Sequence, residues 1–387
     1  MKKPMLAIVG GLGKVGMQIA LETQRLFESV LFLDSGKITA EQIAFLEKTF
    51  SDRWNLETVD VSNKIVVANL LEKYNVDVCV GAVPSFLQDK VAEAAAIYGW
   101  CDYFDLGASQ ECLNRQKKLG ETFREHQKVI MPFCGFDPGM LNILLLSCAK
   151  HLVDCDEIKI YVGGISKQKP ENTLSHYWTF NPESTLETYI GSVFAIQDGG
   201  LVTRKALGGY SNINISARSY EAFFTNCGNK EVMERIAQTS PHIKTCEIKT
   251  VRHLGHWDMI RFLSENDFLT EDMFSIVAEQ LAKSVPYAEQ DIAFLDMRFF
   301  RDGEKQGVIS WAEEGDRKTT TAMQKATAKS AALTIKLALA YCASSSLHPP
   351  LSGFLMPEIF TSGVLNLSPK KIIEEMKGVG LSISSTL

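Results

Sequence analysis

The sequence predicts an α/β protein: a doubly wound parallel sheet with a second, α+β domain inserted before a C-terminal helical return. Three observations predict it. Apolar strand-like runs alternate with helix-like segments through residues 1–150, the pattern changes to short half-solvated strands over 151–318, and a small-residue-rich helical stretch follows in 319–387. Strands separated by helices of this length form right-handed βαβ units with parallel strands. We expect 319–387 to pack back on the first domain.

The strands predicted for the first domain are short apolar runs bounded by turn residues. They lie at 6–9, 30–33, 56–59, 76–80, 103–106 and 129–131. The segments between them carry apolar residues at helical spacing or alanine-rich composition, which favours helix. These predicted helices lie at 14–27, 39–50, 63–74, 86–98 and 110–126.

The inserted domain is expected to mix strands and helices. Residues 158–162 alternate as a strand with one solvated face does. Glycine pairs at 163–164, 199–200 and 208–209 indicate turns, and helical patterns lie at 229–238, 271–283 and 320–342.

Composition and charge exclude several classes of function. The 387 residues are 45% hydrophobic and 22% charged, with a formal net charge of −6. This balance argues against nucleic-acid recognition through a basic face and against a polybasic membrane patch. No run of eighteen apolar residues predicts a spanning helix. We therefore expect no nucleic-acid or membrane partner.

The cysteines and histidines do not suggest a disulfide framework or a metal site. The nine cysteines include no CxxC pair and stand in apolar surroundings. The seven histidines include no HxxxH spacing. Reduced, buried thiols in a cytoplasmic protein are the simplest interpretation, and no metal is expected.

A glycine-rich segment suggests that the first domain binds a dinucleotide. Gly11 to Gly16 read GLGKVG, a GxGxxG motif that follows a predicted strand and opens a predicted helix. This order is that of the Rossmann fingerprint, in which the pyrophosphate meets the helix N-terminus. Asp34 ends the next strand, where an acid can bind a ribose hydroxyl, so the sequence favours NAD, with NADP as the alternative. A turn without ligand is the competing interpretation.

Further residues at strand ends are candidates for the same cofactor, because ligands of such sheets bind beyond the carboxyl ends of the strands. The full candidate cofactor set is Gly11, Gly13, Lys14, Val15, Gly16, Asp34, Asp60, Val83, Pro84 and Gly135.

The segment PFCGFDPGMLN, residues 132–142, follows the last predicted strand of the first domain. Asp137 precedes a proline and an apolar helical run, so it is a candidate helix cap. The alternative is a carboxylate that faces an amine substrate. Gly135 would allow close approach to a nicotinamide.

The segment TVRHLGHWD, residues 250–258, holds the polar candidates of the second domain. His256 could exchange a proton near neutral pH or hold a substrate, and Arg252 could bind a substrate carboxylate. His176 is a weaker candidate. The competing interpretations are a packed histidine and an exposed strand arginine.

Together these segments resemble the saccharopine dehydrogenase family. The resemblance runs over nearly the whole chain and includes GGLGKVG at 10–16, VDVCVGAVPSF at 76–86, YFDL at 103–106, YVGG at 161–164 and GFLMPE at 353–358. The most specific pair is GFDPG with R-x-x-G-H. One departure is Ser166–Asn172, where several members carry a Pro-Leu-x-Tyr segment.

The resemblance implies an NAD(P)-dependent dehydrogenase that oxidises a carbon bearing nitrogen, through an imine, in a lysine-derived amino acid. His256, Asp137 and Arg252 would be catalytic, and Arg252, His256 and His176 would contact a small amino-acid or polyamine-type substrate. A homodimer formed through the second domain is also implied. The alternatives are lysine 6-dehydrogenase, carboxynorspermidine dehydrogenase and, in another class, a non-catalytic NAD-binding sensor.

Overall fold

The computed structural model describes residues 3–107, 109–215, 218–343, 351–362 and 365–386. The chain folds as two compact units. The first comprises Met1–Leu144 and Thr327–Leu367, and the second comprises Leu145–Ala326 and Ser368–Leu387. The predicted fold class, a Rossmann-type parallel sheet with a second α+β unit, is confirmed.

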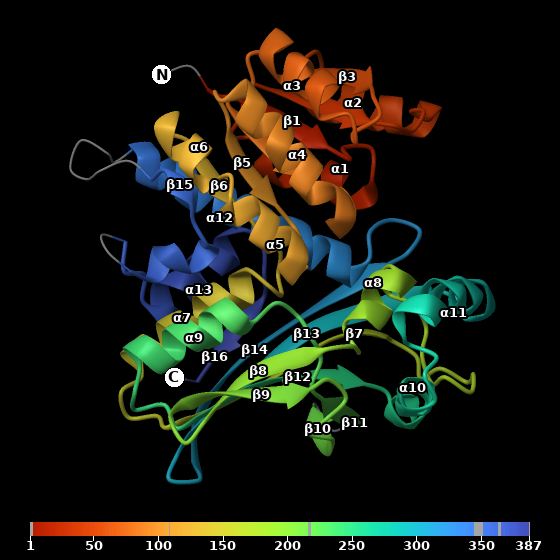
Figure 1. Ribbon diagram of the computed structural model, residues 1–387, viewed down its shortest axis with the longest axis vertical. Coiled ribbons are helices and arrows are strands. Elements are labelled where there is room, and N and C mark those ends of the chain that lie inside the picture. The colour runs from red at the N-terminus through yellow and green to blue at the C-terminus, as the bar shows by residue number, and fades with distance from the viewer. Residues whose placement is uncertain (1–2, 108, 216–217, 344–350, 363–364, 387) are drawn as a thin grey trace. The chain divides into compact units, whose positions relative to one another are not determined.

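The described residues of the first unit form a seven-stranded parallel sheet in the order β15-β6-β5-β4-β1-β2-β3 (Figure 1). Its strands are β1 (Met5–Val9), β2 (Ser29–Asp34), β3 (Trp54–Thr58), β4 (Val78–Gly81), β5 (Asp102–Asp105), β6 (Val129–Met131) and β15 (Gly353–Phe354). The inner strands β1, β2 and β4 are almost fully buried. Burial on both faces is expected of a parallel sheet that carries helices on each side.

The helices of this unit agree with the predicted segments except in two places. They are α1 (Lys14–Thr23), α2 (Ala40–Phe50), α3 (Lys64–Lys73), α4 (Ser85–Tyr98), α5 (Gln110–Lys117), α6 (Gly120–Glu125) and the 3₁₀ helix η1 (Pro357–Thr361). The single helix predicted at 110–126 is wrong: the chain turns at Lys118, and α6 starts at Gly120, where a Cβ atom would meet Phe354 Cβ at 2.8 Å. Helix α1 ends at Thr23, whose Oγ1 donates to Ile19 O at 2.7 Å.

The second unit contains a nine-stranded mixed sheet among its described residues. Its main order is β10-β11-β12-β7-β13-β14-β16, with β8 paired to β12 and β9 paired to β8. The strands are β7 (Glu157–Ser166), β8 (Ser192–Gln197), β9 (Gly200–Lys205), β10 (Ser211–Ile215), β11 (Arg218–Phe223), β12 (Thr245–Arg252), β13 (Gln290–Arg301), β14 (Glu304–Asp316) and β16 (Ile383–Ser385). Strands β7 and β12 are parallel, and the other pairs are antiparallel.

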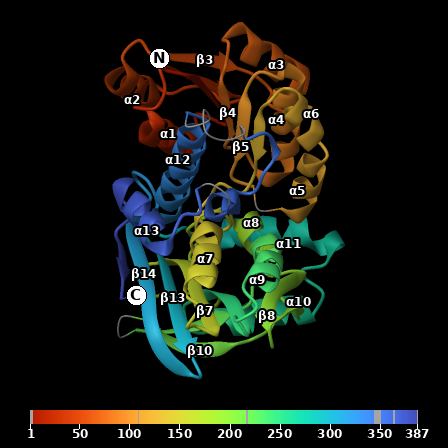
Figure 2. The ribbon, with the colours of Figure 1, turned by 90° about the vertical axis from the view of Figure 1, so that its left-hand side faces the viewer.

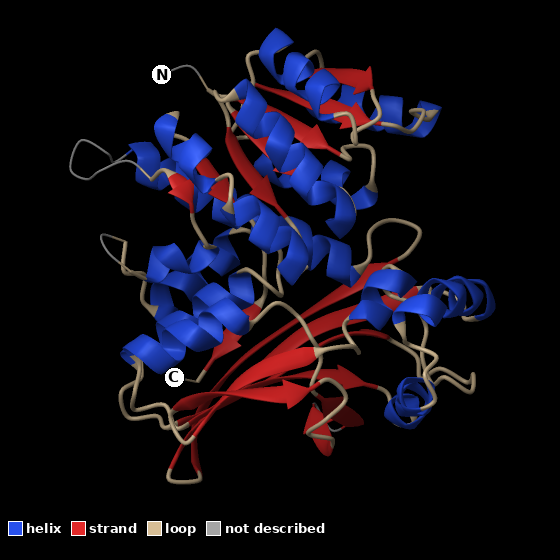
Figure 3. Cartoon of the chain, in the orientation of Figure 1, coloured by secondary structure: helices blue, strands red, loops and turns tan. Residues whose placement is uncertain are grey.

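The two faces of this sheet differ in polarity. Ile158, Ile160 and Met297 point to one face and are fully buried, and Figure 3 shows some helices of this unit on one side of the strands and others at the end of the sheet. The alternate positions of the same strands carry charged residues, as the period of two in a strand requires. Figure 2 shows β13 and β14 running side by side as a long hairpin.

The remaining helices connect or cover these sheets. Helices α7 (Met140–His151) and α12 (Ala322–Ala343) each contribute residues to both units. The second unit also contains α8 (Pro182–Glu187), α9 (Lys230–Thr239), α10 (His256–Glu265), α11 (Glu271–Ser284) and α13 (Pro369–Gly378). Within the described ranges, every helix is too short or too polar to cross a bilayer.

The C-terminal segment is divided between the units. Strand β15 pairs with β6 and extends the parallel sheet, whereas β16 pairs with β14 in the mixed sheet. The expectation that all of 319–387 packs on the first domain therefore differs from the structure, in which residues 368–387 belong to the second unit. Backbone pairing by the three-residue strand β16 decides the placement, and so short a strand gives little signal in sequence.

Gly16→Ala tests the close packing of α1 on the glycine-rich turn. A Cβ atom at Gly16 would meet Gly10 O at 2.6 Å and Gly11 Cα at 2.9 Å, both backbone atoms. We expect the free energy of unfolding to fall by about 1–3 kcal/mol, as overpacking does, in urea denaturation. The matched control is Gly378→Ala, which lies in α13 with nothing within 4 Å of the added atom. Equal effects of the two substitutions would contradict the packing argument.

Candidate functional site

The glycine-rich turn of the first unit leaves the start of α1 open. Gly13 is the N-cap residue, has an extended backbone and provides no side-chain cap. A Cβ atom at Gly13 would have only Gly10 O within 4 Å, at 3.2 Å. Lys14 and Val15 open the helix, so their amides lie at its positive end. Backbone amides of this kind, beside a residue without a side chain, suit the pyrophosphate of a dinucleotide.

Asp34 holds the same turn in place. Its Oδ2 accepts from Leu12 N and its Oδ1 accepts from Gly36 N, both at 2.9 Å. Gln42 Nε2 donates to Leu12 O at 2.9 Å. Each carboxylate oxygen keeps a further lone pair, so Asp34 can still accept a ribose hydroxyl.

The Asp60 side chain forms its hydrogen bonds with Ser62 and not with the glycine-rich turn. It is exposed after the edge strand β3, and its Oδ1 accepts from Ser62 N at 3.0 Å and Ser62 Oγ at 2.7 Å. These bonds lower the pKa of the Asp60 carboxyl. They stabilise a local turn, and this structural role alone explains an aspartate at position 60.

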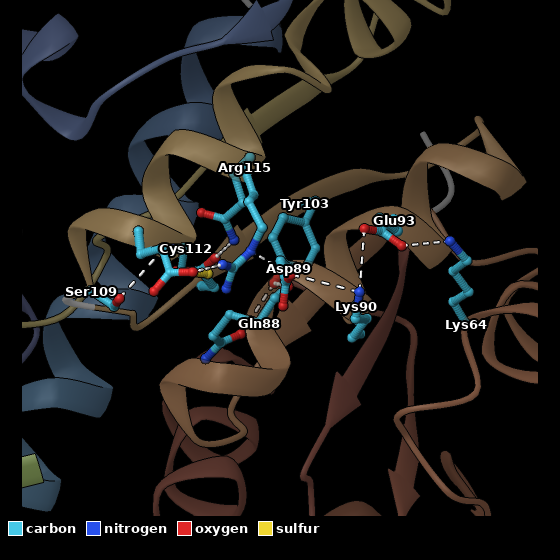
Figure 4. A network of polar contacts seen from close by, with 12 residues as sticks. Lys64, Gln88, Asp89, Lys90, Glu93, Tyr103, Ser109, Cys112 and Arg115 are labelled. Carbon is cyan, nitrogen blue, oxygen red and sulfur yellow. Dashed lines mark hydrogen bonds and ion pairs between the residues drawn. The ribbon is translucent and has the colours of Figure 1, made fainter. Parts of the chain in front are cut away.

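Gln88 positions the loop that holds Val83 and Pro84 (Figure 4). Its Nε2 donates to Gly81 O at 3.1 Å and to Val83 O at 2.9 Å, and Tyr103 Oη donates to Gln88 Oε1 at 3.1 Å. Gln88 is buried in α4. It was not among the residues predicted from the sequence, although a glutamine on a buried helix face is a usable signal.

The network in Figure 4 continues along α4 to α5. Asp89 is 3% exposed, and its Oδ2 lies 2.7 Å from Arg115 Nε. Lys90 bridges Asp89 and Glu93 at 3.8 and 3.6 Å. The ion pair between Arg115 and Asp89 joins α5 to α4, so we assign this network to the stability of the unit.

Asp105, at the end of β5, anchors the start of the PFCGFDPGMLN segment. Its Oδ1 accepts from Gly107 N at 2.8 Å and Phe133 N at 3.4 Å, and Gln116 Nε2 donates to its Oδ2. Burial raises the pKa of the Asp105 carboxyl to about 6, although these donors act in the opposite direction. The backbone carbonyl of Asp105 also accepts from Cys134 N at 2.8 Å.

Asp137 does not cap a helix, so that alternative is wrong. Helix α7 starts at Met140, and its first amides donate to backbone carbonyls: Met140 N to Gly135 O and Leu141 N to Phe136 O, both at 2.9 Å. The Oδ1 atom of Asp137 is buried and has no hydrogen-bond partner among the described residues. A turn of backbone carbonyls leaves the carboxylate free for another use.

Burial raises the pKa of the Asp137 carboxyl to about 7. A carboxyl in that range exchanges protons at neutral pH, which is what a general base requires. Gly135 lies in the same turn and forms an isolated bridge with Gly139.

In the second unit, the structure brings Arg252, His256 and His176 together. Tyr189 Oη lies 3.0 Å from His256 Nε2 and accepts from Arg252 Nε at 2.9 Å. The rings of His176 and His256 have centroids 4.7 Å apart. All four side chains are at most 8% exposed. Tyr189 was not predicted from the sequence, because it lies 63 positions from Arg252 in the chain.

The histidines of this cluster are neutral at physiological pH. Burial, followed by the charge of Arg252, lowers the pKa of His256 to about 3. Burial and the neighbouring His256 and Arg252 hold the pKa of His176 well below its ordinary value. The geometry therefore favours His256 as a fixed neutral ring over a group that exchanges protons near pH 7.

Arg252 has no carboxylate partner within the described part of the chain. Its Nη1 donates to Val251 O at 3.0 Å, and its guanidinium lies 5.8 Å from the centre of the Tyr189 ring. The neighbouring acid, Glu221, accepts instead from the backbone amides of Gly255 and Trp257 at the start of α10. A buried cation without a counter-ion is costly, so this guanidinium suits an anionic ligand.

The described residues contain no group of three or more His, Cys, Asp or Glu arranged to hold a metal ion. The candidate groups are thus a dinucleotide turn and a raised-pKa carboxyl in the first unit, and a buried cationic cluster in the second.

Comparisons with known proteins agree with this architecture. A family model described as saccharopine dehydrogenase C-terminal domain matches residues 135–381. An apo, histidine-tagged saccharopine dehydrogenase (L-Glu forming) from Saccharomyces cerevisiae is 14% identical, with a TM-score of 0.73 over 99% of this chain and 100% of that chain. An engineered D-amino acid dehydrogenase bound to NADP⁺ is 14% identical, with a TM-score of 0.42 over 96% of each chain. At these identities, the first likeness supports the fold.

Asp137→Asn tests the buried carboxyl through stability. The folded pKa of about 7 exceeds the ordinary value of about 4, so the native state binds more protons than the unfolded state between those values. Wild-type stability should therefore fall as pH rises from about 4 to 7, by about 1.4 kcal/mol for each pH unit at most. The Asp137→Asn variant has no such carboxyl, so its free energy of unfolding, measured by urea denaturation, should rise relative to that of the wild type from about pH 4 to 7.

The control for this series is Asp52→Asn, an exposed aspartate in the same unit. It should keep the pH dependence of the wild type. A constant difference between wild type and Asp137→Asn from pH 4 to 8 would show that the carboxyl has no raised pKa.

Proposed function

The chain belongs to the saccharopine dehydrogenase family, and on that premise we propose that it is an NAD(P)-dependent oxidoreductase acting on a C–N bond of a lysine-derived amino acid. One observation carries the proposal beyond the family: Asp137, just beyond β6 of the dinucleotide-type sheet, has a buried oxygen without a partner and a pKa raised to about 7. Oxidation of an amine requires a base of this kind near neutral pH.

The dinucleotide supplies a hydride acceptor when bound. Asp137 accepts the proton that leaves the substrate nitrogen as the hydride leaves the adjacent carbon. The resulting imine is hydrolysed by water, which divides the substrate at the original C–N bond. With a pKa raised to about 7, the Asp137 carboxyl has both its protonated and its ionised form accessible near neutral pH, so the group can accept and return the proton.

The buried guanidinium of Arg252 supports an amino-acid substrate. A substrate carboxylate would provide the counter-ion that the described residues do not offer, and Arg–carboxylate bonds combine charge with fixed geometry. His176 and His256 belong to the same proposed site as neutral hydrogen-bonding and packing groups. This assignment replaces direct proton exchange by His256, since its pKa is lowered to about 3.

The geometry of Asp34 supports NAD over NADP. Its carboxylate lies at the end of β2 and is held by the turn amides of Leu12 and Gly36. A 2′-phosphate beside it would meet a negative charge, whereas a ribose hydroxyl would meet an acceptor.

We also propose a homodimer formed through the charged face of the mixed sheet. Three ion pairs on that face alternate in sign along their strands: Lys159–Glu157, Lys249–Glu247 and Arg298–Asp296. Their strands are neighbours, with Arg298 opposite Lys159 in the register. An equal number of acids and bases makes the face self-complementary about a two-fold axis.

A turnover experiment tests the proposed reaction. The purified chain is mixed with NAD⁺ or NADP⁺ and, separately, saccharopine, lysine or carboxynorspermidine, and reduced cofactor is followed at its absorbance band. We expect turnover with saccharopine and preference for NAD⁺. Asp137→Asn should lower kcat by about 100-fold or more while cofactor affinity is kept, and Asp52→Asn should resemble the wild type.

Other outcomes distinguish the alternatives. Turnover of lysine alone would indicate a lysine 6-dehydrogenase, and turnover of carboxynorspermidine would indicate a polyamine enzyme. Tight NAD binding without turnover of any of the three would favour the non-catalytic sensor. Full activity of Asp137→Asn would remove that residue from the chemistry.

Light scattering after size exclusion tests the dimer. The expected mass is twice the 43.0 kDa of the chain, falling toward the monomer in Lys159→Glu because like charges then face each other. Restoring the pair in the swapped order, Glu157→Lys with Lys159→Glu, serves as the control for net charge. A monomeric wild type would exclude the dimer.

A further inference from the structure

Tyr189 joins the two polar groups of the second unit that the proposed function uses. It lies just beyond α8, is 1% exposed, and contacts both Arg252 and His256 through one oxygen. We propose that Tyr189 is a positioning residue: it fixes the guanidinium of Arg252 so that its outer edge binds a carboxylate end-on. This inference rests on the proposed function in taking that carboxylate to belong to the substrate.

The direction of each hydrogen bond follows from His256. Its Nδ1 lies 2.9 Å from Leu174 O, and a carbonyl can only accept, so Nδ1 carries the proton. Since the ring is neutral, Nε2 is then an acceptor. Tyr189 must give its single proton to Nε2, which leaves the lone pairs of its oxygen for the Nε–H of Arg252.

The protonation states make this direction stable. Burial raises the pKa of the Tyr189 phenol, against the opposing effect of Arg252, so the proton stays on Tyr189. The pKa of His256 is lowered to about 3, so Nε2 stays an acceptor at neutral pH. The order Arg252 to Tyr189 to His256 to Leu174 is therefore the arrangement in which each hydrogen bond of this series has one donor and one acceptor.

The arrangement leaves a defined part of Arg252 for a ligand. The Nε–H is committed to Tyr189, and one hydrogen of Nη1 is committed to Val251 O. A guanidinium has five N–H donors, so three remain on the two Nη nitrogens. They suit an end-on pair of bonds to a carboxylate, whereas a side-on pair would need the Nε–H that Tyr189 occupies.

Nearby groups favour an anion over a cation at this position. The ring of His176 lies against that of His256, and burial lowers its pKa, so His176 adds no second positive charge beside Arg252. Glu221 holds the start of α10 through Gly255 and Trp257. Arg252 thus has no ion-pair partner among the described residues, and Glu221, which stands opposite it in the register of β11 and β12, is taken up by backbone amides.

Tyr189→Phe tests the inference by direct binding. The probe is glutarate, a dicarboxylate without a reactive C–N bond, titrated calorimetrically into the wild type and variant. We expect the affinity for glutarate to fall at least about tenfold, the usual loss for one hydrogen bond to a charged group. NAD affinity should not change. The matched control is Tyr210→Phe, which loses one exposed bond of 3.0 Å to Asn212 in the same unit.

A double-mutant cycle separates positioning from general destabilisation. If Tyr189 acts through the fork of Arg252, Tyr189→Phe should have little further effect in an Arg252→Lys background, because the lysine has no fork to orient. Additive losses in that background, or an unchanged glutarate affinity in Tyr189→Phe, would overturn the inference. So would a wild type that does not bind glutarate.

A second measurement tests the inference if Tyr189→Phe does not fold. 3-Fluorotyrosine at position 189 keeps the shape of the ring but makes the phenol a stronger donor and a weaker acceptor. It should shift the ¹⁵N resonance of His256 Nε2 and weaken glutarate binding. The absence of both effects would overturn the inference. Glutarate binding without turnover of any amino acid would contradict the proposed function and leave the positioning role standing. Turnover of an amino acid with an unchanged KM in Tyr189→Phe would support the proposed function and contradict the positioning role.

Discussion

Burial of both faces of the parallel sheet is the constraint on which the chemistry of the first unit depends. Strands β1, β2 and β4 have almost no exposed side chains, so polar groups can stand only where a strand ends. Asp34 ends β2, Asp105 ends β5, and Asp137 follows β6. The carboxyl ends of parallel strands share one edge. The hydrophobic core thus dictates where the glycine-rich turn and a carboxyl with an unpartnered oxygen can be placed.

Hydrogen bonding then decides what each buried group can do. Asp105 is fully buried and Asp137 is partly exposed with a buried Oδ1; the first accepts from Gly107, Phe133 and Gln116, whereas the Oδ1 of the second has no partner among the described residues. The pKa of Asp105 rises to about 6 and that of Asp137 to about 7, in the order that their donors predict. A satisfied carboxyl is a structural anchor, and an unsatisfied one is available for chemistry.

The sequence predicts those features that depend on neighbouring residues. The glycine motif, the six N-terminal strands and most helices follow from periodicity and turn residues, which act over a few positions. Tyr189, Gln88 and β16 depend on partners far along the chain, such as His256 at 67 positions from Tyr189, and no local pattern specifies them. Asp137 looked like a cap because its neighbours are those of a cap. In the structure, the first amides of α7 donate instead to the backbone carbonyls of Gly135 and Phe136.

Charge balance links ligand binding to protonation in the second unit. Arg252 contributes to the lowered pKa of both His176 and His256, after burial, because a nearby cation opposes a second one. A carboxylate on the guanidinium would cancel that charge and remove its part of the effect, leaving burial and the neighbouring histidines as the causes that lower each pKa. The pKa of each histidine would then rise while remaining below its ordinary value. With such a ligand, the cluster would gain a counter-ion without acquiring a second charge at neutral pH.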